Sequence, residues 1–422
     1  MDVLKALQSY SIALDLLVNY WWAYLPVLLF LGFLFAWLEY IQTQYFNSLS
    51  WTLLKIKPPP DVDRSPKAVE QIFAGLHGVF TKPVSWKEKL FKGKILDCFS
   101  FEIVGQGGVT NFYIRTLSDY KNIVESNIFA QYPDAEISEA EDYMKDWPDK
   151  LPNEEYDLFG VELILSKEDA FPIQTYPLFE EKMAGLEQIK RIDPLSSFSE
   201  IFSTFRPGEN FVVQILAKPV GDDWLKKTQA QLDQVLGKEA KKEKTLGDMV
   251  FGPIDELLAG TAMKKEETRE KKLSAPEEEK VKAIGKKMSK IGFETGIRIM
   301  YVAKKEIFHR YHFTAISGAF RQFSAANLNS FKVNKNTLTF SSGKFAFLSL
   351  SNKGLFADQQ VFEKKARLFQ NLKARVPAKK EFILNTEELA TIFHLPGLEV
   401  KAPMFPRVEA KKGQPPSGLS LE

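Results

Sequence analysis

The sequence predicts an α+β protein with an N-terminal transmembrane helix and two related β-β-α-β-β units. Three observations lead to this prediction: an uncharged apolar run near the N-terminus, pairs of β-rich segments that are each followed by an amphipathic helix, and a long charged segment between the strands of the second pair. With 422 residues, of which 45% are hydrophobic, the chain is long enough for two or three ordinary domains and too apolar to be disordered throughout.

The expected divisions of the chain follow from these signals. In chain order they are an interfacial helix (1–19), the transmembrane helix (20–40), a linker with a short strand (41–63), the first α+β unit (64–192), the second unit (193–375) with a helical insertion (222–290), and a C-terminal segment with a flexible tail (376–422). The linker prediction rests on three consecutive prolines, which have no amide donors, and the tail prediction rests on a Pro-, Gly- and Ser-rich end.

The clearest signal is the membrane segment. Residues 20–38 contain no charged residue, and a helix of this length spans roughly 29 Å of hydrocarbon. Amphipathic aromatic residues, which favour the two membrane interfaces, flank the run: Trp21, Trp22, Tyr24, Trp37 and Tyr40. No small-residue cleavage site follows, so we expect a retained single-pass anchor rather than a cleaved signal peptide.

The segment before the anchor and the orientation of the anchor are less strongly determined. Residues 1–19 fit either a helix on the bilayer surface or an extension of the spanning helix. The nearby basic residues are Lys5 on one side and Lys55 and Lys57 on the other, which gives little orientation bias. A single cysteine and the absence of an Asn-x-Ser/Thr acceptor favour a cytosolic C-terminal body.

The first α+β unit is predicted from a hairpin and the helix that follows it. A helix at 66–77 precedes β-rich segments at 99–104 and 109–116, which are joined by glycines. Ser118 then begins a helix with one apolar face. Strands at 135–141 and 159–165 are expected to complete the unit.

The second unit repeats this order with strands at 211–218 and 296–303. A helix follows whose phenylalanines and isoleucine lie on one face, and then come short strands near Phe331 and at 345–350. The charged insertion between the paired strands is either a solvated helical arm or a partner-binding element. We expect it to be dispensable for folding, because a flexible insertion adds only a slowly growing loop-closure cost.

No catalytic, cofactor or metal site is predicted. The 56 basic and 54 acidic residues are too balanced for binding to nucleic acid over the whole surface. There is no phosphate loop for ATP, Cys98 precedes an apolar strand and is expected to be packed, and His309 and His312 lack a third ligand. The basic residues of 286–321, which are interleaved with aromatic ones, fit a solvated amphipathic helix better than a nucleic-acid groove.

Four stretches carry a resemblance to a known group: 64–78, 193–219, 315–332 and 383–397. They resemble a poorly characterised bacterial membrane-anchored domain that, in many relatives, precedes an FtsK/HerA-type motor ATPase of conjugation or type IV secretion. The resemblance implies no catalytic residue. Since the chain ends at Glu422 without a phosphate loop, we expect the motor to be a separate polypeptide.

Three functions are therefore compared. The favoured one is a non-enzymatic membrane adaptor that docks a separate FtsK/HerA-type ATPase, with Leu395, Leu398 and Phe405 on the docking surface, membrane lipid as a second partner, and nucleic acid bound only indirectly or weakly. The alternatives are an enzyme with an unrecognised site and a DNA-binding membrane protein that acts through 286–321. The transported substrate and the oligomeric state stay open.

Overall fold

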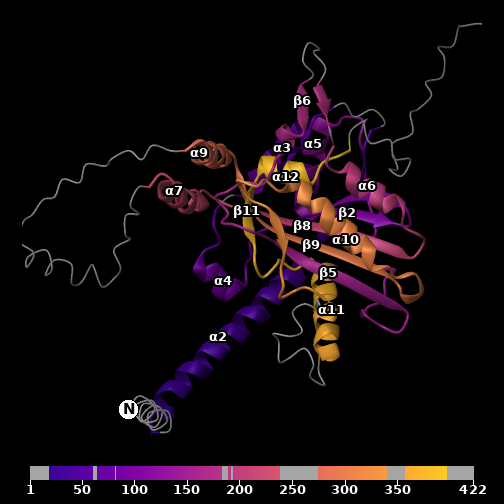
Figure 1. Ribbon diagram of the computed structural model, residues 1–422. Coiled ribbons are helices and arrows are strands. Elements are labelled where there is room, and N and C mark those ends of the chain that lie inside the picture. The colour runs from indigo at the N-terminus through magenta and orange to yellow at the C-terminus, as the bar shows by residue number, and fades with distance from the viewer. Residues whose placement is uncertain are drawn as a thin grey trace, which may run out of the picture. The chain divides into compact units, whose positions relative to one another are not determined.

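The computed structural model describes residues 19–59, 64–80, 82–182, 189–191, 193–237, 274–339 and 357–396, which divide into two compact units (Figure 1). Unit 1 contains Met1–Ser50 and Lys82–Asp97, and unit 2 contains Trp51–Thr81 and Cys98–Glu422. The predicted interfacial helix, apart from Asn19, the predicted strand at 345–350 and the predicted flexible tail lie outside the described residues.

Unit 1 consists of a long apolar helix and a short helix that packs against it. The long helix, α2 (Trp21–Ser48), continues past the predicted end at residue 40 and is long and apolar enough to cross a membrane. The short helix, α4 (Trp86–Lys92), accepts a hydrogen bond at the carbonyl of Leu90 from Trp37 Nε1, at 3.0 Å. Gly93 ends α4 with φ 63°, and a Cβ there would lie 2.2 Å from the Ile41 carbonyl oxygen, so only glycine permits this approach.

The body of unit 2 is built from two halves with the same order of elements. The first half contains β1 (Trp51–Lys57), α3 (Lys67–Leu76), β2 (Phe99–Gln106), β3 (Val109–Leu117), α5 (Lys121–Gln131) and β4 (Glu136–Glu139). The second half contains β5 (Tyr156–Leu165), α6 (Ser196–Ser203), β8 (Glu209–Pro219), β9 (Gly292–Lys304), α10 (Arg310–Ala319) and β10 (Phe331–Val333). Each half is therefore a β-α-β-β-α-β unit.

The strand order confirms that the two halves are equivalent. The first half-sheet has the order β4-β1-β3-β2 and the second has β10-β5-β9-β8, with antiparallel neighbours throughout. This is the split β-α-β arrangement of ferredoxin-like folds. Antiparallel pairing of β2 with β8 joins the halves into one sheet, and β11 (Phe382–Asn385) adds a ninth strand beside β9.

The two faces of the sheet carry separate hydrophobic cores. Helices α3, α5, α6, α10 and α12 (Thr386–Ile392) cover one face, and their apolar residues pack on inward-facing residues of the strands (Figure 1). Phe202 on α6 lies over Gly105 of β2, where a Cβ would come within 2.4 Å of the ring. Helix α11 (Ala357–Ala374) and the chain around Tyr143 and Trp147 cover the other face.

The predicted fold class is confirmed, but two strands were placed wrongly. The hairpin at 99–116 and the pairing of 211–218 with 296–303 are both present. The strand at 51–57, which the prediction assigned to the linker, is β1 and lies inside the sheet between β3 and β4. The strand at 159–165 was expected to complete the first unit, yet as β5 it pairs with β9 and β10 of the second half.

Both ends of the charged insertion pack into the body, so the expectation of a solvated helical arm is wrong for these two ends. Helices α7 (Asp223–Val235) and α9 (Ala275–Met288) pack together, and Trp224 and Ile284 are buried. Lys287 Nζ lies 3.0 Å from Glu388 Oε2, and neither side chain is exposed. Residues 238–273 lie outside the described residues.

We therefore expect that replacing residues 222–290 by a short Gly/Ser turn destabilises the body. The replacement leaves Glu388 as a buried carboxylate without its lysine, which costs about 3–5 kcal/mol. The control replaces only 238–273 with a flexible linker and keeps both helices. Urea unfolding of the two variants measures the difference, and equal midpoints would show that the two helices do not stabilise the body.

Candidate functional site

Four buried polar side chains form a row across the central strands of the sheet. Glu162 on β5 lies opposite Arg298 on β9, Arg298 lies opposite Gln214 on β8, and Gln214 lies opposite Glu102 on β2. Each of the four residues is at most 2% exposed. Buried charges cost free energy unless they are paired and hydrogen-bonded, so this row needs a complete set of partners.

Arg298 connects the row to the end of α11. Its guanidinium donates to Gln214 Oε1 at 2.7 Å and to Glu162 Oε1 at 2.9 Å. It also donates to the carbonyl oxygens of Asn371 and Val376, each at 3.1 Å. The last carbonyls of a helix have no partner within the helix and carry partial negative charge, so a cation at this position stabilises the end of α11.

Arg375 closes the other end of the row. It follows α11 with φ 55° and donates from Nε to Glu102 Oε1 at 2.8 Å, while Tyr143 donates to Glu102 Oε2 at 2.9 Å. Arg375 also holds Asp142 through two hydrogen bonds, at 2.5 and 3.1 Å. Burial alone would raise the pKa of Asp142, but the hydrogen bonds and charge of Arg375 lower it below its usual value of 3.8.

A cavity of about 430 Å³ lies at the Glu162 end of the row. Its ionisable lining residues are Glu162, Glu363, Lys364, Arg367 and Lys379. Glu162 is buried and the other four are exposed, so the rim is charged and solvated. Among the described residues, Glu162 Oε2 and Arg298 Nε have no hydrogen-bond partner, which is unusual for buried polar atoms. The volume lies within the range of small-molecule sites.

Much of the basic region at 286–321 is neutralised inside unit 2. Lys286 and Lys290 both pair with Glu387 on α12, and Lys290 also pairs with Glu70 on α3. Arg298 belongs to the buried row, and Lys304 pairs with Glu155. These side chains are held by acids, so they do not form the free basic surface that the DNA-binding alternative requires.

Of the two histidines examined for metal binding, His312 belongs to a buried cluster. His312 Nε2 lies 3.1 Å from Glu209 Oε1, and Tyr301 donates to the same oxygen at 2.6 Å. Burial lowers the pKa of His312, which keeps the ring neutral near pH 7. The described residues contain no group of three side chains with metal-ligand chemistry.

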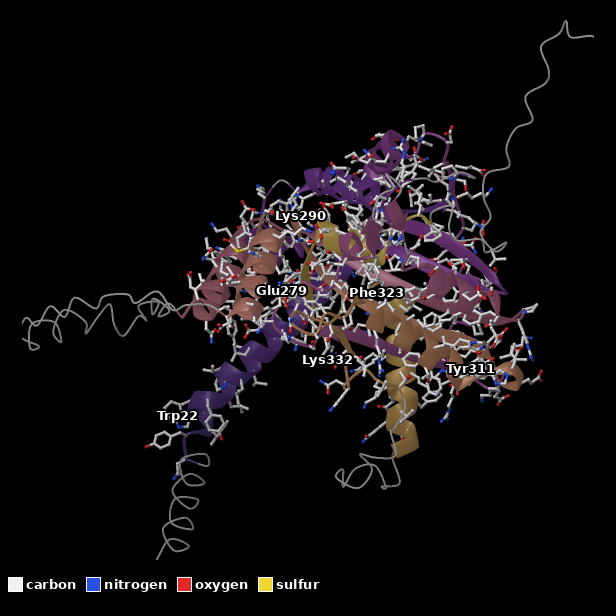
Figure 2. All side chains as sticks on the ribbon, turned by 45° about the horizontal axis from the view of Figure 1, so that its top comes forward. Trp22, Glu279, Lys290, Tyr311, Phe323 and Lys332 are labelled. Carbon is white, nitrogen blue, oxygen red and sulfur yellow. The ribbon has the colours of Figure 1, made fainter. Side chains whose placement is uncertain are left out.

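The predicted anchor residues lie on α2, and of the three predicted docking residues only Leu395 is among the described residues. Trp21, Trp22, Trp37 and Tyr40 are exposed large side chains, Tyr24 is half-buried, and Figure 2 shows Trp22 projecting from α2. Leu395 was expected to be exposed, but it is only 4% exposed and belongs to the core beneath α12. Leu398 and Phe405 lie outside the described residues.

The sequence contained a signal for the polar row that was missed. Each of its members is the one charged or amide residue within an apolar strand segment: Glu102 in FSFEIV, Glu162 in GVELIL, Gln214 in FVVQIL and Arg298 in GIRIMY. A polar residue in such a strand either is buried without a partner, which costs free energy, or pairs with another buried polar residue. Arg375, by contrast, lies outside any strand and could not be linked to Glu102 by local pattern. Cys98 is half-buried, and burial raises the pKa of its thiol to about 12.

We expect Arg375→Met to lower the free energy of unfolding by about 3–5 kcal/mol, because it leaves Glu102 buried without its cation. The matched control is Lys373→Met. Its ion pair with the exposed Asp149 is worth at most about 1 kcal/mol. Chemical denaturation at pH 7 measures both. Equal losses in the two variants would contradict a special role for the buried pair.

The same pair predicts a pH dependence. Asp142 is more acidic in the folded than in the unfolded chain, so its contribution is fully present above pH 3.8 and is lost as the pH falls from there through the lowered pKa. Arg375→Met should remove this part of the acid sensitivity.

Comparison with known proteins places the chain in a family without assigning an activity. No curated protein matches the sequence significantly. Residues 41–405 match a family described as a domain of unknown function, DUF8128, and this match covers the whole of unit 2 up to residue 405 and part of unit 1. Because the match extends over most of the chain, the protein belongs to the DUF8128 family.

Proposed function

We propose that the protein is a single-pass membrane adaptor that docks a separate FtsK/HerA-type motor ATPase at the cytoplasmic face of a bacterial membrane. The observation that carries the proposal is α2, a helix that is long and apolar enough to cross a membrane and whose apolar stretch contains no residue buried by the described parts of the protein. A soluble core helix would be covered by the body, whereas this helix offers its apolar side chains to a surrounding lipid phase.

The resemblance of four stretches supports a motor ATPase as the partner. The places of these stretches in the fold show which residues the resemblance concerns. The stretches form α3, α6 with β8, the end of α10 with β10, and β11 with α12. Most of their buried apolar residues belong to one hydrophobic core, and Val212 belongs to the core on the other face of the sheet. The resemblance therefore concerns the residues that make the body fold, and the docking surface has to be found separately.

The binding test needs a truncation that spares the core. Deleting 383–422 would remove β11 and α12, whose side chains are buried. Stopping the chain after Pro396 retains both elements and removes Leu398 and Phe405. We expect the full-length protein, extracted in mild detergent, to co-purify with the FtsK/HerA-type ATPase encoded beside it, and the truncated protein to lose it.

The controls separate the parts of this prediction. Alkaline carbonate should leave the full-length protein in the membrane fraction, and its extraction would contradict the anchor. Unchanged ATPase recovery with the truncated chain would move the docking surface to another part of the body. If the intact protein recovers no ATPase, the adaptor function is rejected.

A second candidate function, the binding of a small polar molecule, is favoured by the cavity beside Glu162. An unpartnered carboxylate oxygen at the base accepts a donor, and Lys364, Arg367 and Lys379 at the rim suit an anionic group. A molecule that carries both a hydrogen-bond donor and an anionic group, such as an amino acid, fits this arrangement better than a purely cationic molecule.

We expect glutamate, used as the probe, to raise the melting temperature of the protein, because it binds only the folded state. Arg367→Gln should reduce the shift, since it removes a rim cation that belongs to no described ion pair of the fold. Inorganic phosphate and spermidine serve as the anionic and cationic controls. No shift with any probe, or the same shift in the variant, would reject the cavity as a binding site.

A further inference from the structure

Helix α4 exposes large apolar side chains in a strongly basic segment. Trp86 is 65% exposed and Phe91 is 69% exposed. Residues 82–94 contain five lysines and one glutamate, and no described residue forms an ion pair with these lysines. Exposed aromatic residues next to unpaired lysines are typical of segments that lie at a membrane surface.

The local sequence explains why this segment is a helix. Ser85 and Glu88 form a capping box in which the Ser85 amide donates to Glu88 Oε2 at 3.1 Å. Gly93 ends the helix in the left-handed conformation. At about 100° per residue, Trp86, Leu90 and Phe91 fall within one half of the helical circumference, together with Lys87, and Glu88, Lys89 and Lys92 fall within the other.

The contact with α2 places α4 at a definite depth. Trp37, which binds the Leu90 carbonyl, is next to the last residue of the uncharged run, and Glu39 is the first charged residue after it. If α2 spans a bilayer, the plane through Trp37 is its interface, where indole rings and lysine side chains are both stabilised. Helix α4 therefore lies at the level where lipid headgroups are found.

We infer that α4 and the lysines of residues 82–94 bind the anionic phospholipid headgroups of the bilayer that α2 spans. The inference rests on the proposed membrane anchor. Trp86 and Phe91 enter the region between headgroups and acyl chains, and Lys82, Lys87, Lys89 and Lys92, all exposed, contact the phosphates. An acidic protein surface would also attract the lysines, but continuity with a spanning helix favours lipid.

This element also fixes an orientation that the sequence left open. Basic residues close to the end of a membrane-spanning helix favour the cytosolic side. The lysines of residues 82–94 were not considered when the orientation was predicted from the sequence, because they lie more than 40 residues after the uncharged run. The fold brings this segment back beside Trp37, at the C-terminal end of the uncharged run of α2. The C-terminal end of α2 is thus the cytosolic end.

The test uses the full-length protein with Cys98 replaced by alanine, in vesicles of phosphatidylcholine mixed equally with phosphatidylglycerol. A nitroxide spin label is attached through Phe91→Cys or, as the matched control on the other half of the helix, Lys92→Cys. Accessibility to oxygen reports the bilayer, and accessibility to a neutral nickel chelate reports water. We expect the label at 91 to be the more accessible to oxygen and the less accessible to nickel.

The lysines are tested by replacing Lys82, Lys87 and Lys89 with glutamine. A lysine near an anionic surface strengthens binding about fivefold, so each replacement should lower the ratio of membrane-inserted to exposed label about fivefold. High salt and vesicles of phosphatidylcholine alone should act in the same direction.

The outcomes distinguish this inference from the anchor. Equal nickel accessibility at 91 and 92 in a protein that resists carbonate extraction overturns the lipid contact and leaves the anchor intact. Extraction by carbonate overturns the anchor itself. Shielding of position 91 only after a soluble partner is added would assign α4 to a protein interface and overturn the lipid inference.

Discussion

The antiparallel pairing of β2 with β8 is the constraint on which unit 2 depends. It runs from Phe99 opposite Ala217 to Gln106 opposite Asn210 and joins two half-sheets of the same topology. In a separate half, β2 or β8 would be an exposed edge strand with buried-type residues on both sides, which is an aggregation hazard. Each edge covers the other, and Phe202 of the second half packs over Gly105 of the first.

The polar row fixes the register of this seam. Glu102 and Gln214 face each other on β2 and β8, and Gln214 Nε2 donates to Glu102 Oε1 at 3.1 Å. A slip of β8 by one residue would turn Gln214 towards the opposite face, which is filled by phenylalanine and aliphatic residues, and would leave Glu102 without it. If hydrophobic pairs replaced the polar row, a slip between β2 and β8 would cost less. The row therefore makes one register of β2 and β8 specific, even though buried ion pairs add little net stability.

The sequence predicted the local elements well and their partners poorly. The hairpin at 99–116 and the amphipathic helix at 66–77 are encoded by neighbouring residues: glycines at the turn and apolar side chains at helical spacing. The partner of a strand is not encoded locally. β5 carries the same apolar pattern whether it pairs with the first half or the second, and only the packed sheet decides between them.

The candidate sites show the same limit. Glu102 and Arg375 are 273 residues apart, and Trp37 and Leu90 are 53 apart, so no periodicity connects them. Leu395 follows a helix in an apolar context that fits a core or a docking surface equally well, and its burial beneath α12 is a tertiary fact. The aromatic residues of α2 could be assigned to an apolar helix from the sequence, because the uncharged run is a local signal.

The distribution of charge connects the two units in one physical argument. The whole chain carries +2, while residues 82–94 alone carry +4, so the remaining residues carry −2. Within unit 2 the basic side chains of α9 and β9 are held by acids of the core, at Lys287 with Glu388 and at Arg298 with Glu162. The lysines around α4 are left without such partners among the described residues, next to an apolar helix. A nearly neutral chain can therefore hold a strongly basic surface at one place, because the fold pairs charges elsewhere and leaves these lysines without described acidic partners. In the inference made above, an anionic bilayer would supply those partners.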